Sequence, residues 1–399
     1  MRRMVLCSIA ALMAATAGSG ASAKTKESIL YSFEGTSDGR APSYLLLRDD
    51  KGALYGTTVG GGAGQAGVVY KLSRAGELTV LHDFAGGMDG SSPSSNVVMD
   101  SKKTLYGATY HGGNGAIAGG DCDSGDCGTI YKIKKSGRAS IIHAFTGMED
   151  GGNPSGDIAM GTDGSLYGTT THGGAGQHGV VFKVGRDGKF SVLHAFAGGP
   201  DDGERPVGDL ILDDDGNIYG TAAAGGAESS GTVFKVAPGG TMTLLHSFGG
   251  DDTGFEPLGG LLRDGDGNLY GTTAFGGSGG FGAVFKLTPG GTASLVRAFT
   301  NDANGGTPGG HLTWGPAGNI YGIAASGGTV TGDCPNGCGL VYSLALNGKL
   351  KVLHRFGGAG DGRTPGYGMV PDDQGLLYGA SGNGGASNAG AVYRIKPGG

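Results

Sequence analysis

The chain has 399 residues, of which 90 are glycine, and its formal net charge is −6 at pH 7. This mild acidity disfavours nucleic acids as partners, because their binding is driven by basic surfaces. The glycine content opposes long helices, since glycine destabilises a helix interior, but it suits tight turns.

Residues 1–23 have the pattern of a secretory signal peptide. Arg2 and Arg3 precede an apolar segment that ends near Ala15, and Ala21-Ser22-Ala23 has the small residues of a cleavage site. No later segment approaches the roughly 20 apolar residues that a membrane helix needs. The sequence thus predicts an exported protein, periplasmic or extracellular, whose residues 24–399 form a single domain without a membrane span.

A short motif, Leu/Ile-Tyr-Gly, recurs seven times along the chain, with its tyrosines at positions 55, 106, 167, 219, 270, 321 and 378. The steps between these tyrosines are 51, 61, 52, 51, 51 and 57 residues, and such a period indicates a repeat architecture. Each copy contains four short apolar runs bounded by Gly, Asp, Asn or Pro, which is typical of strands joined by turns. Four strands in about 50 residues match one blade of a β-propeller. We therefore predict an all-β, seven-bladed β-propeller with four antiparallel strands per blade.

The first and last strands of the chain are out of phase with the repeat. Residues 29–33 read as the fourth strand of a blade, and residues 391–395 read as the third strand of another. Seven complete blades therefore require the N-terminal strand to close the C-terminal blade. Such closure removes two exposed sheet edges, which would otherwise promote aggregation.

The repeat unit also resembles that of a known family. Gly-Asn-Leu-Tyr-Gly-Thr-Thr, then Gly-Gly, then Gly-Ala-Val-Phe-Lys-Leu occupy residues 267–273, 276–277 and 282–287, and the second half recurs at 231–236 and 245–248. This pattern is similar to the GloVer tandem repeat, and the resemblance covers nearly all of residues 28–396. It implies an exported or surface-displayed bacterial protein and leaves the activity open. Members often carry a C-terminal anchor, which we do not find here, so we expect a released or periplasmic protein.

Four cysteines follow the signal segment and form two local pairs, Cys122 with Cys127 and Cys334 with Cys338. In an exported protein such pairs are expected to be disulfides that pin loops. A zinc site built from all four is the alternative, and the unequal spacings disfavour it.

Several conspicuous residues occur in most blades and are most simply explained by the scaffold. Five histidines share one position in the fourth strand, at 82, 143, 194, 246 and 354, where we expect packing or hydrogen bonding between blades. The motif tyrosines are expected to have a buried ring and a bonded hydroxyl. The Asp-x-Asp-x-Asn strings at 213–217 and 264–268 resemble the start of a calcium loop but lack the acidic residue at position twelve, so turn chemistry is favoured over calcium. We expect no metal site and no cofactor.

Residues that differ between blades point to a site on one face of the ring. In a propeller, the connections from the fourth to the first strand and from the second to the third strand surround the mouth of the central channel. The starts of the inner strands and the second-to-third connections place these candidates there: Asn96, Asp157, Asp209, His311, Tyr44, Tyr367, His111 and His172.

Carboxylates, imidazoles and tyrosines around a glycine-lined mouth suit a polyhydroxylated ligand. The first hypothesis is a non-catalytic, monomeric binding or scaffold propeller that recognises a glycan or another cell-surface ligand. The second is a polysaccharide-active enzyme, with Asp157 and Asp209 as the paired carboxylates of a glycoside hydrolase, or His311 or His172 with a tyrosine as base and acid of a lyase. Hydrogen bonding to loop amides is the alternative role of the two aspartates, and an exposed loop position that of His111 and His172.

Overall fold

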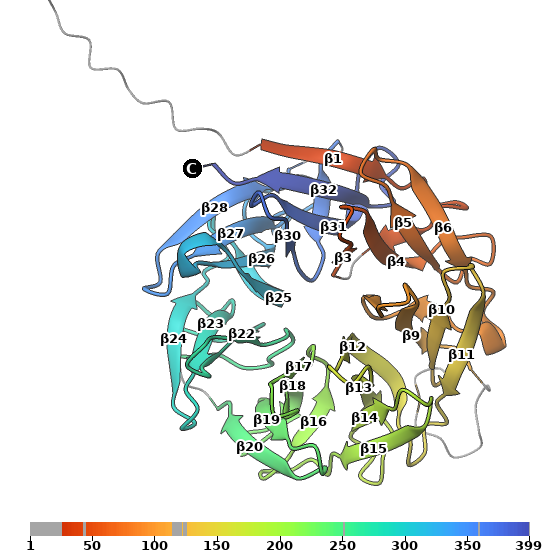
Figure 1. Cartoon of the computed structure of the whole chain (residues 1–399). Coiled ribbons are helices and arrows are strands. Elements are labelled where there is room, and N and C mark those ends of the chain that lie inside the picture. Colours follow the sequence, from red (N-terminus) through yellow and green to blue (C-terminus); the bar gives the residue numbers. More distant parts are fainter. Residues whose placement is uncertain are drawn as a thin grey trace, which may run out of the picture.

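The computed structural model describes residues 26–42, 45–113, 122, 126–249, 252–357 and 360–398. Within these residues, seven antiparallel sheets stand around a common axis, and consecutive sheets follow one another around the ring (Figure 1). This is the predicted seven-bladed β-propeller. The signal segment 1–23 and Tyr44 lie outside the described residues, so the signal peptide stays a prediction.

The inner strand of most blades is short or split into two pieces. The inner strands are β2 (Arg40–Pro42) with β3 (Leu47–Arg48), β7 (Ser91–Pro93) with β8 (Val98–Met99), β12 (Gly152–Met160), β16 (Gly203–Pro206) with β17 (Ile211–Leu212), β21 (Leu262–Arg263), β25 (Gly306–Trp314), and β29 (Gly362–Pro365) with β30 (Val370–Pro371). The second strands carry the Tyr-Gly motif and are β4 (Leu54–Gly60), β9 (Leu105–His111), β13 (Leu166–His172), β18 (Ile218–Gly225), β22 (Leu269–Thr273), β26 (Ile320–Ser326) and β31 (Leu377–Gly384).

The third and fourth strands complete each blade toward the outside. The third strands are β5 (Val68–Leu72), β10 (Thr129–Ile133), β14 (Val180–Val184), β19 (Thr232–Val236), β23 (Ala283–Leu287), β27 (Leu340–Leu344) and β32 (Ala391–Lys396). The outer strands are β6 (Leu78–Asp83), β11 (Ala139–Ala144), β15 (Phe190–Ala195), β20 (Met242–Ser247), β24 (Ala293–Ala298), β28 (Leu350–Arg355) and, in the seventh blade, β1 (Lys26–Ser32). Two 3-10 turns, η1 (Gly87–Asp89) and η3 (Pro316–Gly318), lie in connections.

Because the four strands of a blade alternate in direction, their connections separate into two faces. The loop face carries the connections from outer strand to next inner strand and from second to third strand, such as residues 84–90 and 112–113 of the second blade. The turn face carries the tight hairpins between first and second and between third and fourth strands, such as residues 100–104 and 134–138.

The ring closes between the two ends of the chain. Strand β1 pairs antiparallel with β32, with Lys26 opposite Lys396 and Ser32 opposite Ala391 (Figure 1). The seventh blade therefore takes three strands from the C-terminal end and its outer strand from the N-terminal end. This confirms the closure that the phase of the repeat predicts.

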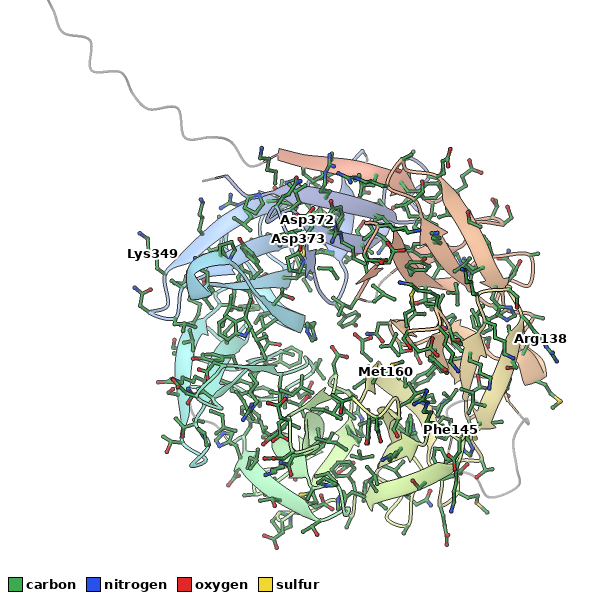
Figure 2. All side chains as sticks on the ribbon, in the orientation of Figure 1. Arg138, Phe145, Met160, Lys349, Asp372 and Asp373 are labelled. Carbon is green, nitrogen blue, oxygen red and sulfur yellow. A yellow bond between two sulfur atoms is a disulfide. The ribbon has the colours of Figure 1, made fainter. Side chains whose placement is uncertain are left out.

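A phenylalanine after each outer strand forms the core between neighbouring blades. Phe145 is fully buried, and its ring lies 5.4 Å from that of Phe182 on the third strand of the next blade (Figure 2). Phe33, after the closing strand, contacts Tyr70 of the first blade in the same way, at 5.2 Å. Each such pair contributes about 0.5–1.5 kcal/mol beyond its buried area, so the contacts between blades hold the ring together.

The aspartate that ends an inner strand organises the hairpin on the turn face. In the fourth blade, Asp213 Oδ1 accepts the backbone N–H groups of Asp215 and Asn217, and Asp213 Oδ2 accepts the Tyr219 hydroxyl at 2.9 Å. Asp264 has the equivalent bonds in the fifth blade. These contacts confirm the turn role of the Asp-x-Asp-x-Asn strings and, for Tyr219 and Tyr270, the bonded hydroxyl.

Both cysteine pairs are disulfides, Cys122 with Cys127 and Cys334 with Cys338. They lie in second-to-third connections of the second and sixth blades, on the loop face. This confirms the predicted pairing and leaves no free thiolate among them for zinc. No helix that is long and apolar enough to cross a bilayer occurs in the described part of the chain.

Candidate binding site at the channel mouth

A run of hydrogen bonds joins the inner strands of consecutive blades. The Asn96 backbone N–H, between β7 and β8, donates to Asp157 Oδ1 at 2.6 Å. The Asp157 N–H, on β12, donates in turn to Asp209 Oδ1 at 2.7 Å, and Asp209 lies between β16 and β17. Each carboxylate thus accepts a backbone N–H group from the inner-strand segment of the preceding blade. Bonds to local loop amides were the alternative prediction for the two aspartates, whereas the structure shows bonds between blades.

The same run continues to His311, two blades beyond Asp209. His311 Nδ1 lies 3.3 Å from Asp209 Oδ2, and the backbone N–H of His311 on β25 donates to the Tyr367 carbonyl. The contact passes over Gly260 of the fifth blade. A Cβ at Gly260 would lie 2.8 Å from Asp209 Cβ and 3.2 Å from His311 Nδ1, so a side chain there would push the pair apart.

The contact between Asp209 and His311 determines which of their polar atoms a ligand can reach. Since Asp209 occupies Nδ1, the Nε2 atom of His311 is the nitrogen that can meet a ligand. The His311 side chain keeps 24% of its surface exposed, and that of Asp209 keeps 15%. The pair is therefore anchored by the protein yet reachable from the channel.

Asp157 is more deeply placed. It is 8% exposed, and burial, together with the neighbouring Asp209 carboxylate, raises the pKa of Asp157 well above its usual range, against the opposing effect of the Asn96 N–H. Two carboxylates so close together resist ionising at the same time. We therefore infer that Asp157 holds neighbouring inner strands together and has little contact with solvent.

A cavity of about 300 Å³ opens between the sixth and seventh blades on the loop face. His311 does not line it, but the His311 backbone N–H donates to the carbonyl of Tyr367, which does. The cavity wall includes Gly309, Ile323 and Tyr367, and Tyr367 is 51% exposed. The cavity is also lined by Thr364 and Asn383, which are joined by a 2.7 Å hydrogen bond from Asn383 Nδ2 to Thr364 Oγ1. An exposed aromatic ring, an amide and a hydroxyl thus face one small, mainly apolar hollow.

The remaining candidates are separated from this cavity. His172 ends β13 and lies opposite Gly152, the first residue of β12, whereas Asp157 lies deeper along the same strand. His111 lies opposite Ser91 in the second blade, and its ring contacts that of Tyr110. These two histidines therefore belong to the rim of the loop face. Tyr44 falls outside the described residues.

The histidines of the outer strands share one environment, which differs from that of His311. His82, His143, His194 and His354 each place Nε2 at 3.0–3.3 Å from an aspartate seven or eight residues later, namely Asp89, Asp150, Asp202 and Asp361. The same carboxylates accept backbone N–H groups of the loop, such as that of Ala85 by Asp89. These pairs tie each outer strand to the connection that follows, in agreement with the predicted scaffold role. The aspartate partner was missed, although an aspartate seven or eight residues after the histidine is visible in the sequence in four of the five cases.

Comparison with known proteins places the chain in a family. The model of the Gloeobacter/Verrucomicrobia repeat matches residues 17–122, 116–334 and 239–399. The chain belongs to this repeat family. The match agrees with the GloVer resemblance read from the motifs. No curated protein matches the chain.

Solved structures show what the fold of this Gloeobacter/Verrucomicrobia repeat protein is similar to. Virginiamycin B lyase from Staphylococcus aureus has a TM-score of 0.61 and 13% identity, over 94% of this chain and 99% of that chain. A chain named as the extracellular domain of a one component system from B. thetaiotaomicron has a TM-score of 0.57 and 11% identity, over 91% of this chain and 39% of that chain. At such identities the likeness shows the propeller fold alone.

The turn face of this Gloeobacter/Verrucomicrobia repeat protein carries a second hollow, which no sequence motif predicts. A cleft of about 770 Å³ lies between the second and third blades, next to Met160 (labelled in Figure 2). Its charged lining consists of five cations and three carboxylates: Lys102, Lys132, Lys134, Lys135, Arg186, Asp100, Asp163 and Asp187. The acidic net charge of the whole chain concealed this local excess of cations, because residues from two blades meet there only in the folded ring.

Proposed function

We propose that this chain is an exported, non-catalytic propeller that binds a glycan or another polyhydroxylated cell-surface ligand at the channel mouth. The carrying observation is the cavity between the sixth and seventh blades, where Tyr367 offers an exposed ring next to the Asn383 amide and the Thr364 hydroxyl. Small-molecule sites are typically apolar hollows with a few well-placed polar groups. A sugar ring has an apolar face that can lie on an aromatic side chain and hydroxyls that exchange hydrogen bonds with amides, hydroxyls and imidazoles.

Rigidity of the polar groups supports this assignment. The Asp209 carboxylate holds one nitrogen of His311, and the Tyr367 carbonyl holds the His311 backbone, so the imidazole is positioned before a ligand arrives. Groups ordered in advance lose less entropy on binding.

Export is supported by two features. The disulfides Cys122–Cys127 and Cys334–Cys338 are of the kind that persists in oxidising compartments outside the cytosol. Residues 1–23 have the charge and apolar pattern of a signal peptide.

The second candidate is a polysaccharide-active enzyme, and one observation favours it. An imidazole whose Nδ1 is held by a carboxylate is a common arrangement of a general base, and His311 has this arrangement with Asp209. In a lyase-type elimination, Nε2 of His311 would accept the proton that leaves the sugar carbon, and the electrons of that C–H bond would form a carbon–carbon double bond. The glycosidic C–O bond would break at the same time, with a tyrosine hydroxyl protonating the departing oxygen. The glycosidase version is less favoured, because Asp157 and Asp209 each use an oxygen to bind the backbone of a neighbouring blade.

A glycan-array screen combined with assays for new reducing ends and for unsaturated products tests the proposal. We expect binding without turnover, and a loss of binding of at least about tenfold in Tyr367→Ala, since truncating a central aromatic contact costs more than about 1 kcal/mol. Turnover that disappears in His311→Ala would establish the enzyme instead. Absence of binding to every glycan tested would contradict both.

A further inference from the structure

At the start of the outer strand, one blade differs from the other six. In six blades the first residue of this strand pairs with the last residue of the third strand and is apolar, namely Leu78, Ala139, Phe190, Met242, Ala293 and Leu350. In the closing strand β1 the equivalent residue is Glu27, which pairs with Ile395. The exception occurs at the junction between the sixth and seventh blades.

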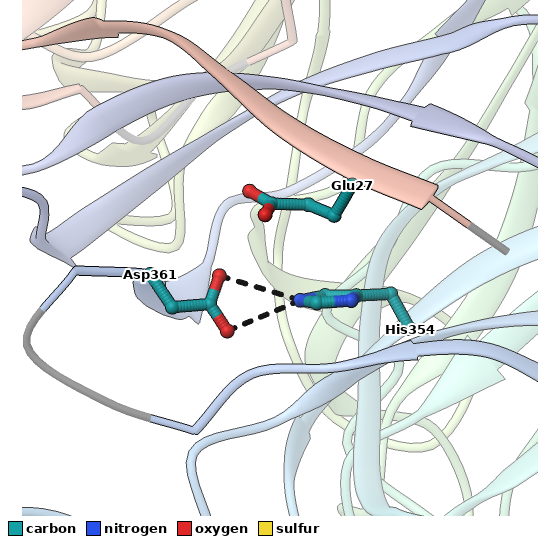
Figure 3. A group of neighbouring side chains, drawn as sticks. All are labelled: Glu27, His354 and Asp361. Atoms are coloured by element: carbon teal, nitrogen blue, oxygen red, sulfur yellow. Dashed lines mark hydrogen bonds and ion pairs between the residues drawn. The ribbon is translucent and has the colours of Figure 1, made fainter.

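This position faces the outer-strand histidine of the preceding blade. Phe190 shows the arrangement most clearly, because its ring stacks on that of His143 with centroids 3.9 Å apart. Glu27 correspondingly points toward His354, whose Nε2 lies 3.2 Å from Asp361 Oδ2 (Figure 3). One ligand atom from each of Glu27, His354 and Asp361 lies within 4.8 Å of the other two.

One oxygen of the Glu27 carboxylate has no hydrogen-bond partner among the residues that the structure describes. This atom, Oε1, is buried. The Glu27 side chain as a whole is half-buried. Two carboxylates this close repel each other, and a cation between them would remove that repulsion.

We propose that Glu27, His354 and Asp361 bind a divalent transition-metal cation of the Zn²⁺ type at the closure of the ring. One imidazole nitrogen and two carboxylate oxygens are ligands that Zn²⁺ accepts, with water completing the coordination. The backbone N–H groups of Gly357 and Gly362 already donate to Asp361 and would keep its carboxylate oriented.

The site would link separate parts of the chain. Glu27 belongs to the N-terminal strand β1, whereas His354 ends the sixth blade and Asp361 precedes the seventh. A bound cation would thus fasten the closing strand to the body of the ring. Binding to the folded state alone raises Tm, by about 3 °C at a 100-fold excess of metal over its Kd for a chain of this size.

Separate titrations of the metal-free protein with Zn²⁺, Mn²⁺ and Ca²⁺, by calorimetry and by thermal unfolding, test the proposal. We expect one site per chain, a rise in Tm, and an affinity at least tenfold weaker in Glu27→Gln and Glu27→Leu. The leucine variant copies the residue of the first and sixth blades, so its metal-free Tm should equal or exceed that of the wild type.

The matched control is His82→Ala in the first blade. His82 has the same aspartate contact, through Asp89, but the residue that follows in the next blade is Ala139, which offers no ligand. Zinc affinity should be unchanged in this variant. The proposal is overturned if the wild type does not bind Zn²⁺, if both Glu27 variants bind it as the wild type does, or if Ca²⁺ binds more tightly than Zn²⁺ and Mn²⁺.

Discussion

An imidazole meets a carboxylate both on the outer strands and at the channel mouth, but the two regions differ in almost every other respect. On the outer strands the contact uses Nε2, joins residues seven or eight positions apart and recurs in four of the described blades, as in His143–Asp150. At the mouth it uses Nδ1, joins Asp209 to His311 across 102 positions, and depends on the missing side chain of Gly260.

The difference separates architecture from function. A contact that recurs in several blades makes a similar contribution in each of them and is explained by folding. The single contact at the mouth requires residues from three blades, and the His311 backbone N–H connects it to the carbonyl of Tyr367 in the cavity wall. We therefore attribute stability to the first kind of pair and ligand recognition to the second.

The largest expected effect is on stability, in His143→Ala. This change removes the hydrogen bond to Asp150 and the stacking of the imidazole on Phe190. Loss of the bond costs about 1–3 kcal/mol and loss of the stacking about 0.5–1.5 kcal/mol. Chemical denaturation should show a free energy of unfolding lower by about 2–4 kcal/mol, with glycan affinity intact. A loss of glycan affinity with unchanged stability would reverse the assignment of roles.

Gly260→Ala should separate the channel pair with a smaller cost to the fold. Its Cβ would come within 2.8 Å of Asp209, and overpacking of this kind costs about 1–3 kcal/mol. We expect glycan affinity to fall by about tenfold or more in calorimetry. Gly265→Ala is the control, since nothing lies within 4 Å of a Cβ at that position. Equal affinities in the two variants would show that the Asp209–His311 contact does not serve binding.

The acidic groups of the two regions should respond to pH with opposite signs. Burial raises the pKa of Asp202, but the bonds from His194, Ala197 and Gly203 outweigh it and lower the pKa below its usual value. Asp202 therefore stabilises the fold above its unfolded pKa of about 3.9, and this contribution disappears as pH falls through the folded pKa. The pKa of Asp157 is raised, so its ionised form costs stability at neutral pH, and the cost disappears as pH falls through that raised pKa.

Two isosteric variants measure these signs by denaturation across pH. Asp157→Asn should be more stable than the wild type at pH 7, on the order of 1 kcal/mol, and should lose the advantage in acid. Asp202→Asn should be less stable at pH 7 and converge with the wild type in acid. Destabilisation of similar size in both variants at pH 7 would contradict the contrast.

The smallest effect is expected at an exposed pair of the same chemistry. His178 Nδ1 lies 3.4 Å from Glu204 Oε1, and both side chains are about one-third exposed, at 34% and 35%. Exposed ion pairs contribute about 0–1 kcal/mol, so His178→Ala should change neither stability by more than about 0.5 kcal/mol nor glycan affinity. A larger change in stability or in glycan affinity would show that a histidine–carboxylate pair outside the repeated positions can also be important.

The fold could be predicted from the sequence because its signals are local and repeated. The Tyr-Gly motif marks each second strand, and the phase of the two terminal strands predicts the pairing of β1 with β32. The cysteine spacing likewise predicts both disulfides.

The site could be predicted only in part. The inner-strand position of Asp157, Asp209 and His311 follows from the repeat, but the contact over Gly260 depends on the curvature of the ring, which no local pattern encodes. The cavity beside Tyr367 and the approach of Glu27 to His354 arise between blades, so they too appear only in the folded chain.

A crystal structure with an oligosaccharide selected on the glycan array tests the central claim most directly. The account predicts a sugar ring against Tyr367, with a hydroxyl within hydrogen-bonding distance of His311 Nε2. Sugar density in the cleft of the turn face between the second and third blades, with the cavity beside Tyr367 empty, would contradict it.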